Sequence, residues 1–253
     1  MYRAQDDDAP KPVILFIHGG SWRSGDPDDY GFVARALVPE GFTVVLAGYR
    51  LGPGGEYPAM LEDAASAIAW TRRNIARYGG DPEAIVIAGH SSGAYNAVQV
   101  TLDPQWLAQK GITPSVIKGV IGMSGPYDFL PLDSDSTKAA FGAAPDLPAT
   151  QPVNYVRKDA PPMLLIHGER DTLVKPRNSK ALSERIDDAG GSVRTIYFPD
   201  MDHNAPLLAL ASPWRKNGEV VPAIVLFAKS VTAGAGPENA EPNPSVPVQS
   251  PIR

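Results

Sequence analysis

Residues 85–94 read IVIAGHSSGA, and this stretch decides the expected fold. Its first half is a short apolar run rich in β-branched residues, which predicts a buried strand, while residues 94–102 contain no Gly or Pro and predict a buried helix. A strand that turns directly into a helix holds the residue at the bend outward. That residue is Ser91, at the centre of a Gly-x-Ser-x-Gly pattern, so its hydroxyl is a candidate nucleophile.

A similar stretch, GMSGP at residues 122–126, lacks the second glycine of the pattern. It has a proline where a helix would begin, so it predicts a turn after another strand. The alternative to a nucleophile is that Ser91 is a structural serine in a tight turn. The Gly-x-Ser-x-Gly pattern alone does not distinguish these two roles. The order of elements along the chain is therefore needed as well.

Apolar runs alternate with helical segments along most of the chain. Expected strands cover residues 13–17, 42–47, 85–88, 116–123, 163–167 and 193–198, and expected helices cover 26–38, 58–78, 94–102, 175–189 and 220–231. Several strands are continuously hydrophobic rather than alternating, which is typical of strands covered on both faces. The chain is therefore expected to form an α/β fold: a doubly wound, mostly parallel sheet with helices on both faces.

Length and composition indicate how the chain is organised. It has 253 residues, of which 43% are hydrophobic, enough for one sizeable core, and a single catalytic domain is expected over residues 1–232. Residues 233–253 are rich in Pro and Gly and hold few apolar residues, so we expect a disordered tail. Residues 127–158 are irregular and predict an excursion of loops and short helices positioned to cover a site.

Composition also excludes several function classes. Cysteine is absent, so there is no disulfide, no Cys nucleophile and no thiolate metal site, and the compartment is left open. The net charge of −5, with acids and bases interspersed, argues against a nucleic-acid partner. No run reaches the roughly 20 apolar residues of a membrane span, and the first residues have no apolar signal-peptide core. The four histidines do not have metal-site spacing, so neither metal nor cofactor is expected.

Reactive groups follow several of the expected strands. The stretch HGGSW (18–22) follows the first strand, Ser91 the third, Asp171 the fifth and His203 the sixth. The carboxyl ends of parallel strands face one crevice, so we expect these groups to meet. A serine nucleophile needs a base and the base needs an orienting carboxylate, and the order Ser, Asp, His along the chain meets that need.

Further motifs accompany this constellation: HGGSW (18–22), YRL (49–51), YPA with ED (57–63), YGGDP (78–82), GHSSGA (89–94), HGERD (167–171) and DH (202–203). On these stretches the chain resembles, over residues 13–228, the α/β-hydrolase esterases of the hormone-sensitive-lipase and feruloyl-esterase-like group, which includes kynurenine formamidases. The resemblance implies Ser91 as nucleophile, His203 as base and Asp171 as the orienting carboxylate. It implies an oxyanion hole made by the backbone N–H groups of Gly20, Ser21 and Ser92.

The start of the chain departs from this group. Its members usually carry two further antiparallel strands before the first strand seen here, and only Tyr2–Arg3 resembles a remnant of one. Either the N-terminal edge of the sheet is missing or reduced, or the natural start lies upstream.

Several neighbouring residues have both a structural and a functional interpretation. His18 is expected to bond the loop backbone, and His90 and His167 to pack. We expect substrate-binding roles or packing roles for three aromatic residues: Trp22, Tyr49 and Tyr127.

The preferred function is a serine hydrolase, of the carboxylesterase type, that cleaves small carboxylic esters and prefers short acyl chains. The alternatives are an aryl-formamide hydrolase and an inactive α/β-hydrolase used as a binding module. The sequence does not indicate the natural ester or the oligomeric state.

Overall fold

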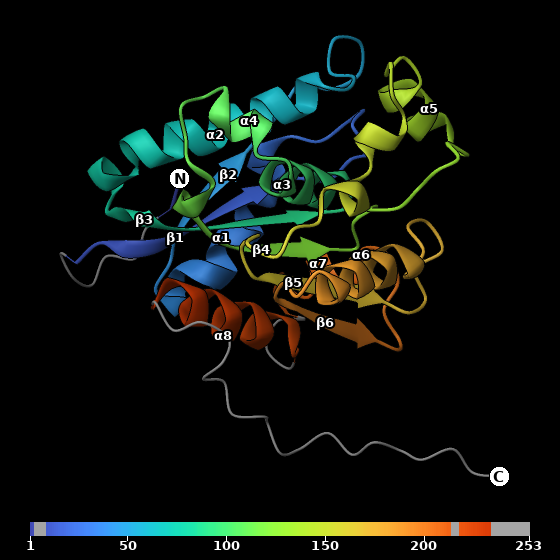
Figure 1. Cartoon of the computed structure of the whole chain (residues 1–253). Helices are drawn as coiled ribbons and strands as arrows, with labels where there is room; N and C mark the ends of the chain where they lie inside the picture. The colour runs from blue at the N-terminus through green and yellow to red at the C-terminus, as the bar shows by residue number, and fades with distance from the viewer. Residues whose placement is uncertain (3–8, 214–217, 234–253) are drawn as a thin grey trace.

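The apolar runs form one parallel sheet in the computed structural model, which describes residues 1–2, 9–213 and 218–233 (Figure 1). Its strand order is β2-β1-β3-β4-β5-β6, and each neighbouring pair is parallel. The strands are β1 (Lys11–Ile17), β2 (Thr43–Ala47), β3 (Gly80–His90), β4 (Ile117–Met123), β5 (Met163–Gly168) and β6 (Val193–Phe198). The expected α/β fold with a parallel sheet is therefore confirmed.

Successive residues of the strands point into two separate cores. In β1, Val13, Leu15 and Ile17 belong to one core, while Ile14 and Phe16 belong to the other. All five side chains are buried because helices cover both faces of the sheet. This explains why the strand is continuously hydrophobic in sequence.

The helices form two layers, one on each face of the sheet (Figure 1). The first layer holds α2 (Ala59–Asn74), α3 (Ser92–Leu102), α4 (Gln105–Ala108), α5 (Asp135–Phe141) and α6 (Arg177–Asp188). The second layer holds α1 (Gly31–Leu37), α7 (Ala205–Leu208) and α8 (Val220–Thr232). Short 3₁₀ helices complete the connections: η1 (Pro27–Tyr30), η2 (Val38–Glu40), η3 (Ile75–Tyr78), η4 (Pro114–Val116), η5 (Pro148–Thr150) and η6 (Pro152–Tyr155).

The helix expected over residues 26–38 is split into η1 and α1. The Asp26 carboxylate caps η1 by accepting the N–H of Asp28 at 2.9 Å, as the Asp-Pro start predicts. Tyr30, the last residue of η1 and the N-cap of α1, has φ −97° and ψ 15°, outside the α-helical region, so two short helices replace one. The irregular segment 127–158 holds α5, η5 and η6, which matches the expected loops and short helices.

Near its start the chain touches the β2 edge of the sheet. Tyr2 makes an isolated antiparallel bridge to Val44, with 3.0 Å hydrogen bonds in both directions. This is the contact expected of a remnant strand, although Arg3 lies outside the described residues. The tail predicted to be disordered, residues 233–253, also lies outside them apart from Ala233.

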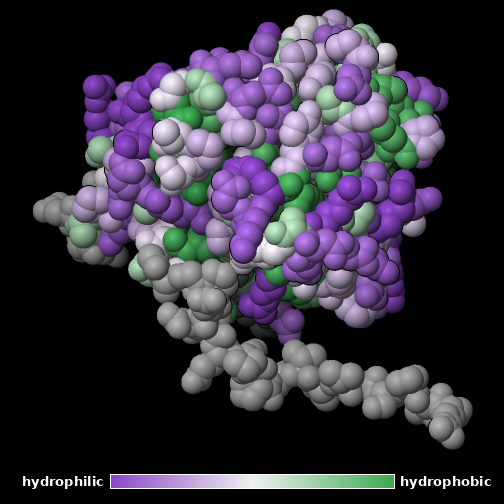
Figure 2. Space-filling model, in the orientation of Figure 1, coloured by the Kyte–Doolittle hydropathy of each residue, from purple (hydrophilic) through white to green (hydrophobic). Residues whose placement is uncertain are grey.

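The visible face of the molecule is mostly hydrophilic, with apolar residues in small separate areas (Figure 2). In the described part of the chain, no helix combines the length and the hydrophobicity that a membrane crossing requires.

Connections from the sheet change direction between β1 and β3. The chain passes from β1 to β2 on one side and later returns to β3 on the other side of β1. At such a reversal the loops leave the carboxyl ends of the two strands in opposite directions and open a crevice. The loop after β1 and the turn after β3 meet there, so the fold positions a site at this point.

Two glycines allow the turn after β3 to be as tight as the motif requires. A Cβ on Gly89 would lie 2.3 Å from the carbonyl oxygen of Gly93, and a Cβ on Gly93 would lie 2.1 Å from that of Ile17. Both distances are far below van der Waals contact, so only glycine fits either position. The start of α3 therefore packs directly against the ends of β1 and β3, and Ser91 is carried between them.

Candidate active site

Ser91 lies at the turn between β3 and α3 in a backbone conformation that L-residues rarely adopt. Its φ is 54° and its ψ is −123°. Such a conformation costs on the order of 1–3 kcal/mol and persists only where the surroundings impose it. Here the Ser91 N–H donates to the carbonyl of Met123 at 2.9 Å, and the Ser91 carbonyl accepts the N–H of Tyr95 at 3.1 Å. These bonds hold the turn between β4 and α3.

The three side chains predicted to act together form one hydrogen-bonded chain. His203 Nε2 lies 2.9 Å from Ser91 Oγ, and His203 Nδ1 lies 2.7 Å from Asp171 Oδ2. A carboxylate only accepts, so Nδ1 carries the proton and Nε2 accepts the serine hydroxyl. All three residues are buried, with exposed fractions of 8% or less. The arrangement has the geometry of a Ser-His-Asp triad.

Asp171 is held by donors on both carboxylate oxygens. Oδ1 accepts the backbone N–H groups of Leu173 and Val174 at 2.9 and 2.8 Å. Oδ2 accepts from His203 and also from His167 Nε2, at 3.1 Å. Burial acts to raise the pKa of Asp171, but the hydrogen bonds from His167 and His203 outweigh it and hold the pKa below its usual range. The carboxylate is therefore ionised.

The two aspartates nearest to His203 in sequence have other partners. Asp202 Oδ1 accepts the N–H groups of Asn204 and Ala205 at 3.1 and 3.0 Å, which shapes the start of α7. Asp200 forms an exposed ion pair with Arg170. Asp171, which lies 32 positions before His203, is the carboxylate that contacts its ring.

His90 supports the loop that carries His203. Its Nε2 donates to the backbone carbonyl of His203 at 2.9 Å, and the two ring centroids are 5.0 Å apart. The side chain is 3% exposed, and burial lowers its pKa to about 4. A neutral imidazole therefore fixes the backbone of the proposed base, which is a more specific contact than the packing expected from the sequence.

The loop after β1 brings backbone donors beside Ser91. Ser21 and Trp22 both have positive φ, 55° and 57°, so this loop bends sharply back. Among the described residues, the N–H groups of Gly20 and Ser21 are not bonded to a backbone carbonyl. Ser92 is the first residue of α3, so its N–H has no acceptor one turn earlier in the helix. These are the three N–H groups expected to form an oxyanion hole.

Aromatic rings hold this loop in place from behind. His18 donates from Nδ1 to the Gly19 carbonyl at 2.7 Å, as expected, and burial lowers the pKa of its imidazole. Its ring stacks on Tyr49, with centroids 4.8 Å apart. The Tyr49 hydroxyl lies 3.0 Å from Ser92 Oγ. Tyr49 therefore supports the loop and α3.

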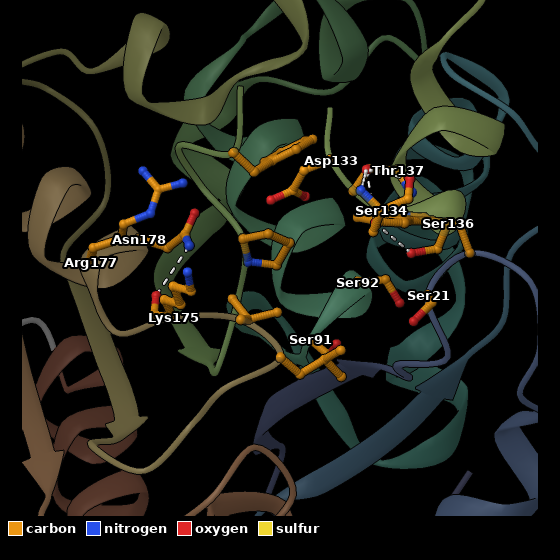
Figure 3. A pocket seen from close by; sticks show the side chains of 15 residues that line it. Ser21, Ser91, Ser92, Asp133, Ser134, Ser136, Thr137, Lys175, Arg177 and Asn178 are labelled. Atoms are coloured by element: carbon orange, nitrogen blue, oxygen red, sulfur yellow. Dashed lines mark hydrogen bonds between the residues drawn. The ribbon is translucent and has the colours of Figure 1, made fainter. Parts of the chain in front are cut away.

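A pocket of about 120 Å³ lies beside Ser91 (Figure 3). One wall carries hydroxyl and carboxylate groups from the start of α5, and the opposite wall carries Lys175 and Arg177. Of the three aromatic residues expected to bind substrate or to pack, Trp22 lines this pocket. Within the described residues, Tyr49 and Tyr127 are not in its lining: Tyr49 packs on His18, and Tyr127 is fully buried in the hydrophobic core.

The segment 127–158 is anchored by an aromatic cluster that the sequence does not reveal. The indole of Trp22 meets Phe141 edge-on at 4.8 Å, and Tyr95 and Phe129 pack against the same ring at 5.2 Å each. The Trp22 indole N–H donates to Asn96 Oδ1 at 3.2 Å. Trp22 thus both lines the pocket and packs in the core. These residues share no local pattern, so only the folded chain brings them together.

Each of the four histidines has a hydrogen-bond partner within the protein. Over residues 1–2, 9–213 and 218–233, no three His, Asp or Glu side chains gather as metal ligands would.

The model of the BD-FAE family matches residues 1–186, well over half of the chain. The chain belongs to the BD-FAE family. It is 30% identical over 242 residues to the esterase LipC of Mycobacterium tuberculosis, and 32% identical over 216 residues to the esterase LipQ of the same organism. These alignments cover 88% and 78% of this chain but 59% and 51% of the relatives, so the chain spans between half and three-fifths of their length.

Solved structures show the same fold. A truncated carbohydrate esterase from gut microbiota has a TM-score of 0.77 and 24% identity, with 90% of this chain and 88% of that one covered. The match confirms the α/β-hydrolase fold for this BD-FAE chain, and the relatives confirm its predicted resemblance to esterases.

The buried His90 makes stability depend on pH. In the unfolded chain the ordinary pKa of His90 is 6.5, and in the folded chain it is about 4. Below about pH 6.5 the unfolded state therefore binds a proton that the folded state excludes, and stability falls as the pH falls toward 4. We expect His90 to account for a loss on the order of 2 kcal/mol between pH 6.5 and 5.

The variant His90→Gln tests this, because its amide can still donate to the His203 carbonyl but does not titrate. Urea unfolding at both pH values gives the free energy of unfolding of each protein. The wild type should lose more stability than the variant over this interval. The same pH slope in both proteins would show that His90 is not the titrating group.

Proposed function

We propose that this chain hydrolyses small carboxylic esters through an acyl-enzyme intermediate, with Ser91 as nucleophile. The observation that carries the proposal is the hydrogen-bonded chain Ser91–His203–Asp171 beside the open backbone N–H groups of the β1 loop. Membership of the BD-FAE family and similarity to the esterases LipC and LipQ support it.

In the first half of the reaction, Ser91 Oγ attacks the ester carbonyl while His203 Nε2 takes its proton. His203 then gives that proton to the oxygen of the leaving alcohol as the carbon–oxygen bond breaks. In the second half, His203 removes a proton from water as the water oxygen attacks the acyl-enzyme carbonyl. The bond from the acyl carbon to Ser91 Oγ then breaks, His203 returns the proton to Ser91 Oγ, and the acid is released. Asp171 keeps the proton of neutral His203 on Nδ1 and stabilises the imidazolium that forms in each half.

The tetrahedral intermediate carries negative charge on the former carbonyl oxygen. We assign its stabilisation to the backbone N–H groups of Gly20, Ser21 and Ser92. Each donor in such a hole lowers the activation barrier by about 3 kcal/mol, because it is already oriented and needs no rearrangement. The positive φ at Ser21 and the position of Ser92 at the start of α3 support this assignment.

The size of the pocket supports a small substrate. A volume of about 120 Å³ is well below the roughly 300–1,000 Å³ of pockets that enclose drug-sized ligands. The wall from segment 127–158 carries Asp133, Ser134, Ser136 and Thr137 near Phe129. A long acyl chain would lie against these polar groups and strip them of water, which favours short acyl chains.

We predict that Ser91→Ala abolishes hydrolysis of a chromogenic ester while the protein stays folded. Loss of the nucleophile in a comparable triad costs on the order of 10⁶ in rate. Steady-state rates and circular dichroism check both parts, and Ser183→Ala, at a half-buried position on α6 that does not line the pocket, serves as a matched control. Activity retained in purified Ser91→Ala would contradict the mechanism.

The wild-type protein separates the alternative functions. Faster cleavage of an aryl formamide than of the aryl ester would favour the formamidase. A wild type without activity on either substrate would favour the binding module.

We predict that Asp171→Asn is far more damaging than Asp202→Asn. Asparagine at position 171 can donate to His203 Nδ1 and so stabilise the wrong tautomer, which costs about 10⁴ in kcat in the serine-protease template. Asp202→Asn leaves the ring contact untouched, and we expect a loss of about tenfold or less. The kcat values of the two folded variants distinguish the two aspartates. A large loss of kcat in Asp202→Asn with a small loss in Asp171→Asn would assign the orienting role to Asp202.

We predict that acetate and butyrate esters are turned over faster than the decanoate ester of the same alcohol. The physical reason is the small volume of the pocket and the polar wall described above. The values of kcat/KM over this acyl series measure the preference. A maximum at decanoate would show that the acyl chain occupies another surface.

A further inference from the structure

His167 lies at the end of β5 with its side chain completely buried, four residues before Asp171. Its Nε2 is 3.1 Å from Asp171 Oδ2 and 2.7 Å from the carbonyl oxygen of Val174. Its Nδ1 is 2.7 Å from the hydroxyl of Ser179, on α6. A packing residue would meet apolar atoms in such a position, whereas both nitrogens of this ring have polar partners.

The partners determine where the proton of His167 lies. A carboxylate oxygen and a carbonyl oxygen both face Nε2, and neither can donate, so Nε2 carries a proton and donates to them. Asp171 Oδ2 therefore accepts hydrogen bonds from two imidazoles, those of His203 and His167. With the two backbone N–H groups on Oδ1, four donors surround this carboxylate.

We propose that His167 is a positioning residue of the active site, which acts on His203 through the Asp171 carboxylate. The inference rests on the proposed function. His167 is not among the residues that line the pocket; it restrains Oδ2 by a hydrogen bond additional to that of His203 and shares the negative charge of the carboxylate. His167 thereby fixes the orientation of the Asp171 carboxylate. It also determines how strongly that carboxylate stabilises the His203 imidazolium.

Two consequences follow from removing this donor. The carboxylate loses a lateral restraint, so His203 is aligned less well with Ser91, and small misplacements of catalytic groups cost up to about a hundredfold in rate. Without the His167 donor, the negative charge on Asp171 Oδ2 is also less neutralised, so it stabilises the His203 imidazolium more strongly. The acidic limb of the kcat/KM profile should therefore move to higher pH, by about half to one unit for one hydrogen bond.

The test compares two amides that differ by one methylene. In His167→Gln the amide reaches the position of Nε2 and can donate to Asp171, whereas in His167→Asn it reaches only the position of Nδ1, near Ser179. Rates are divided by the concentration of active sites from the acyl-enzyme burst, so that unfolded protein does not count. We expect His167→Asn to lose about tenfold to a hundredfold in kcat with KM unchanged and a shifted acidic limb. The kcat of His167→Gln should stay within about threefold of the wild-type value, and the acidic limb of its kcat/KM profile should not shift.

Equal losses in the two variants, or wild-type kcat and acidic limb in His167→Asn, would overturn the inference. If His167→Asn does not fold, His167→Met is used, because it fills the site without a donor. If neither folds, His167→Gln decides alone: a rate and an acidic limb close to those of the wild type support the inference, and a large loss overturns it. A wild-type protein without ester hydrolysis would instead count against the proposed function.

Discussion

The close approach of three backbone segments at Ser91 is the constraint on which the rest of this site depends. The start of α3 lies so near the ends of β1 and β3 that no Cβ fits at Gly89 or Gly93. This contact imposes the positive φ of Ser91 and carries its hydroxyl to the rim of the crevice. It also brings the N–H of Ser92 next to the β1 loop. The proposed nucleophile and the proposed donors for its oxyanion are thus placed by one packing contact.

The polar groups around His203 form a continuous network within the crevice. Ser179, His167, Asp171, His203 and Ser91 are joined by successive hydrogen bonds of 2.7–3.1 Å. His90 adds a bond to the backbone of His203, so the proposed base is held at its ring and at its main chain. Every side chain in this network is buried, and a buried polar group without a partner is costly, so each bond restrains its neighbours.

Much of the fold could be predicted because local pattern carries the information. Continuous apolar runs indicated the strands of a doubly covered sheet, and the order of Ser91, Asp171 and His203 after them indicated which side chains would meet. The helix over residues 26–38 was predicted as one element because its cap is local, but it divides at Tyr30. For Tyr49 the sequence left substrate binding and packing as alternatives. The ring stacks on His18 behind the loop, and the sequence could not choose because side-chain direction there depends on neighbouring elements.

The sequence by itself determined the sheet, the turn at Ser91 and the set of reactive groups at the strand ends, because periodicity and turn chemistry act over a few residues. Only the tertiary structure decided what surrounds those groups. His90 and His203 meet across 113 positions, and Trp22 meets Phe141 through the packing of the excursion on α3. His167 was predicted to pack, but its Nε2 contacts the Asp171 carboxylate, for the same reason. Contacts of this kind depend on how whole elements are packed, which no local pattern of residues encodes.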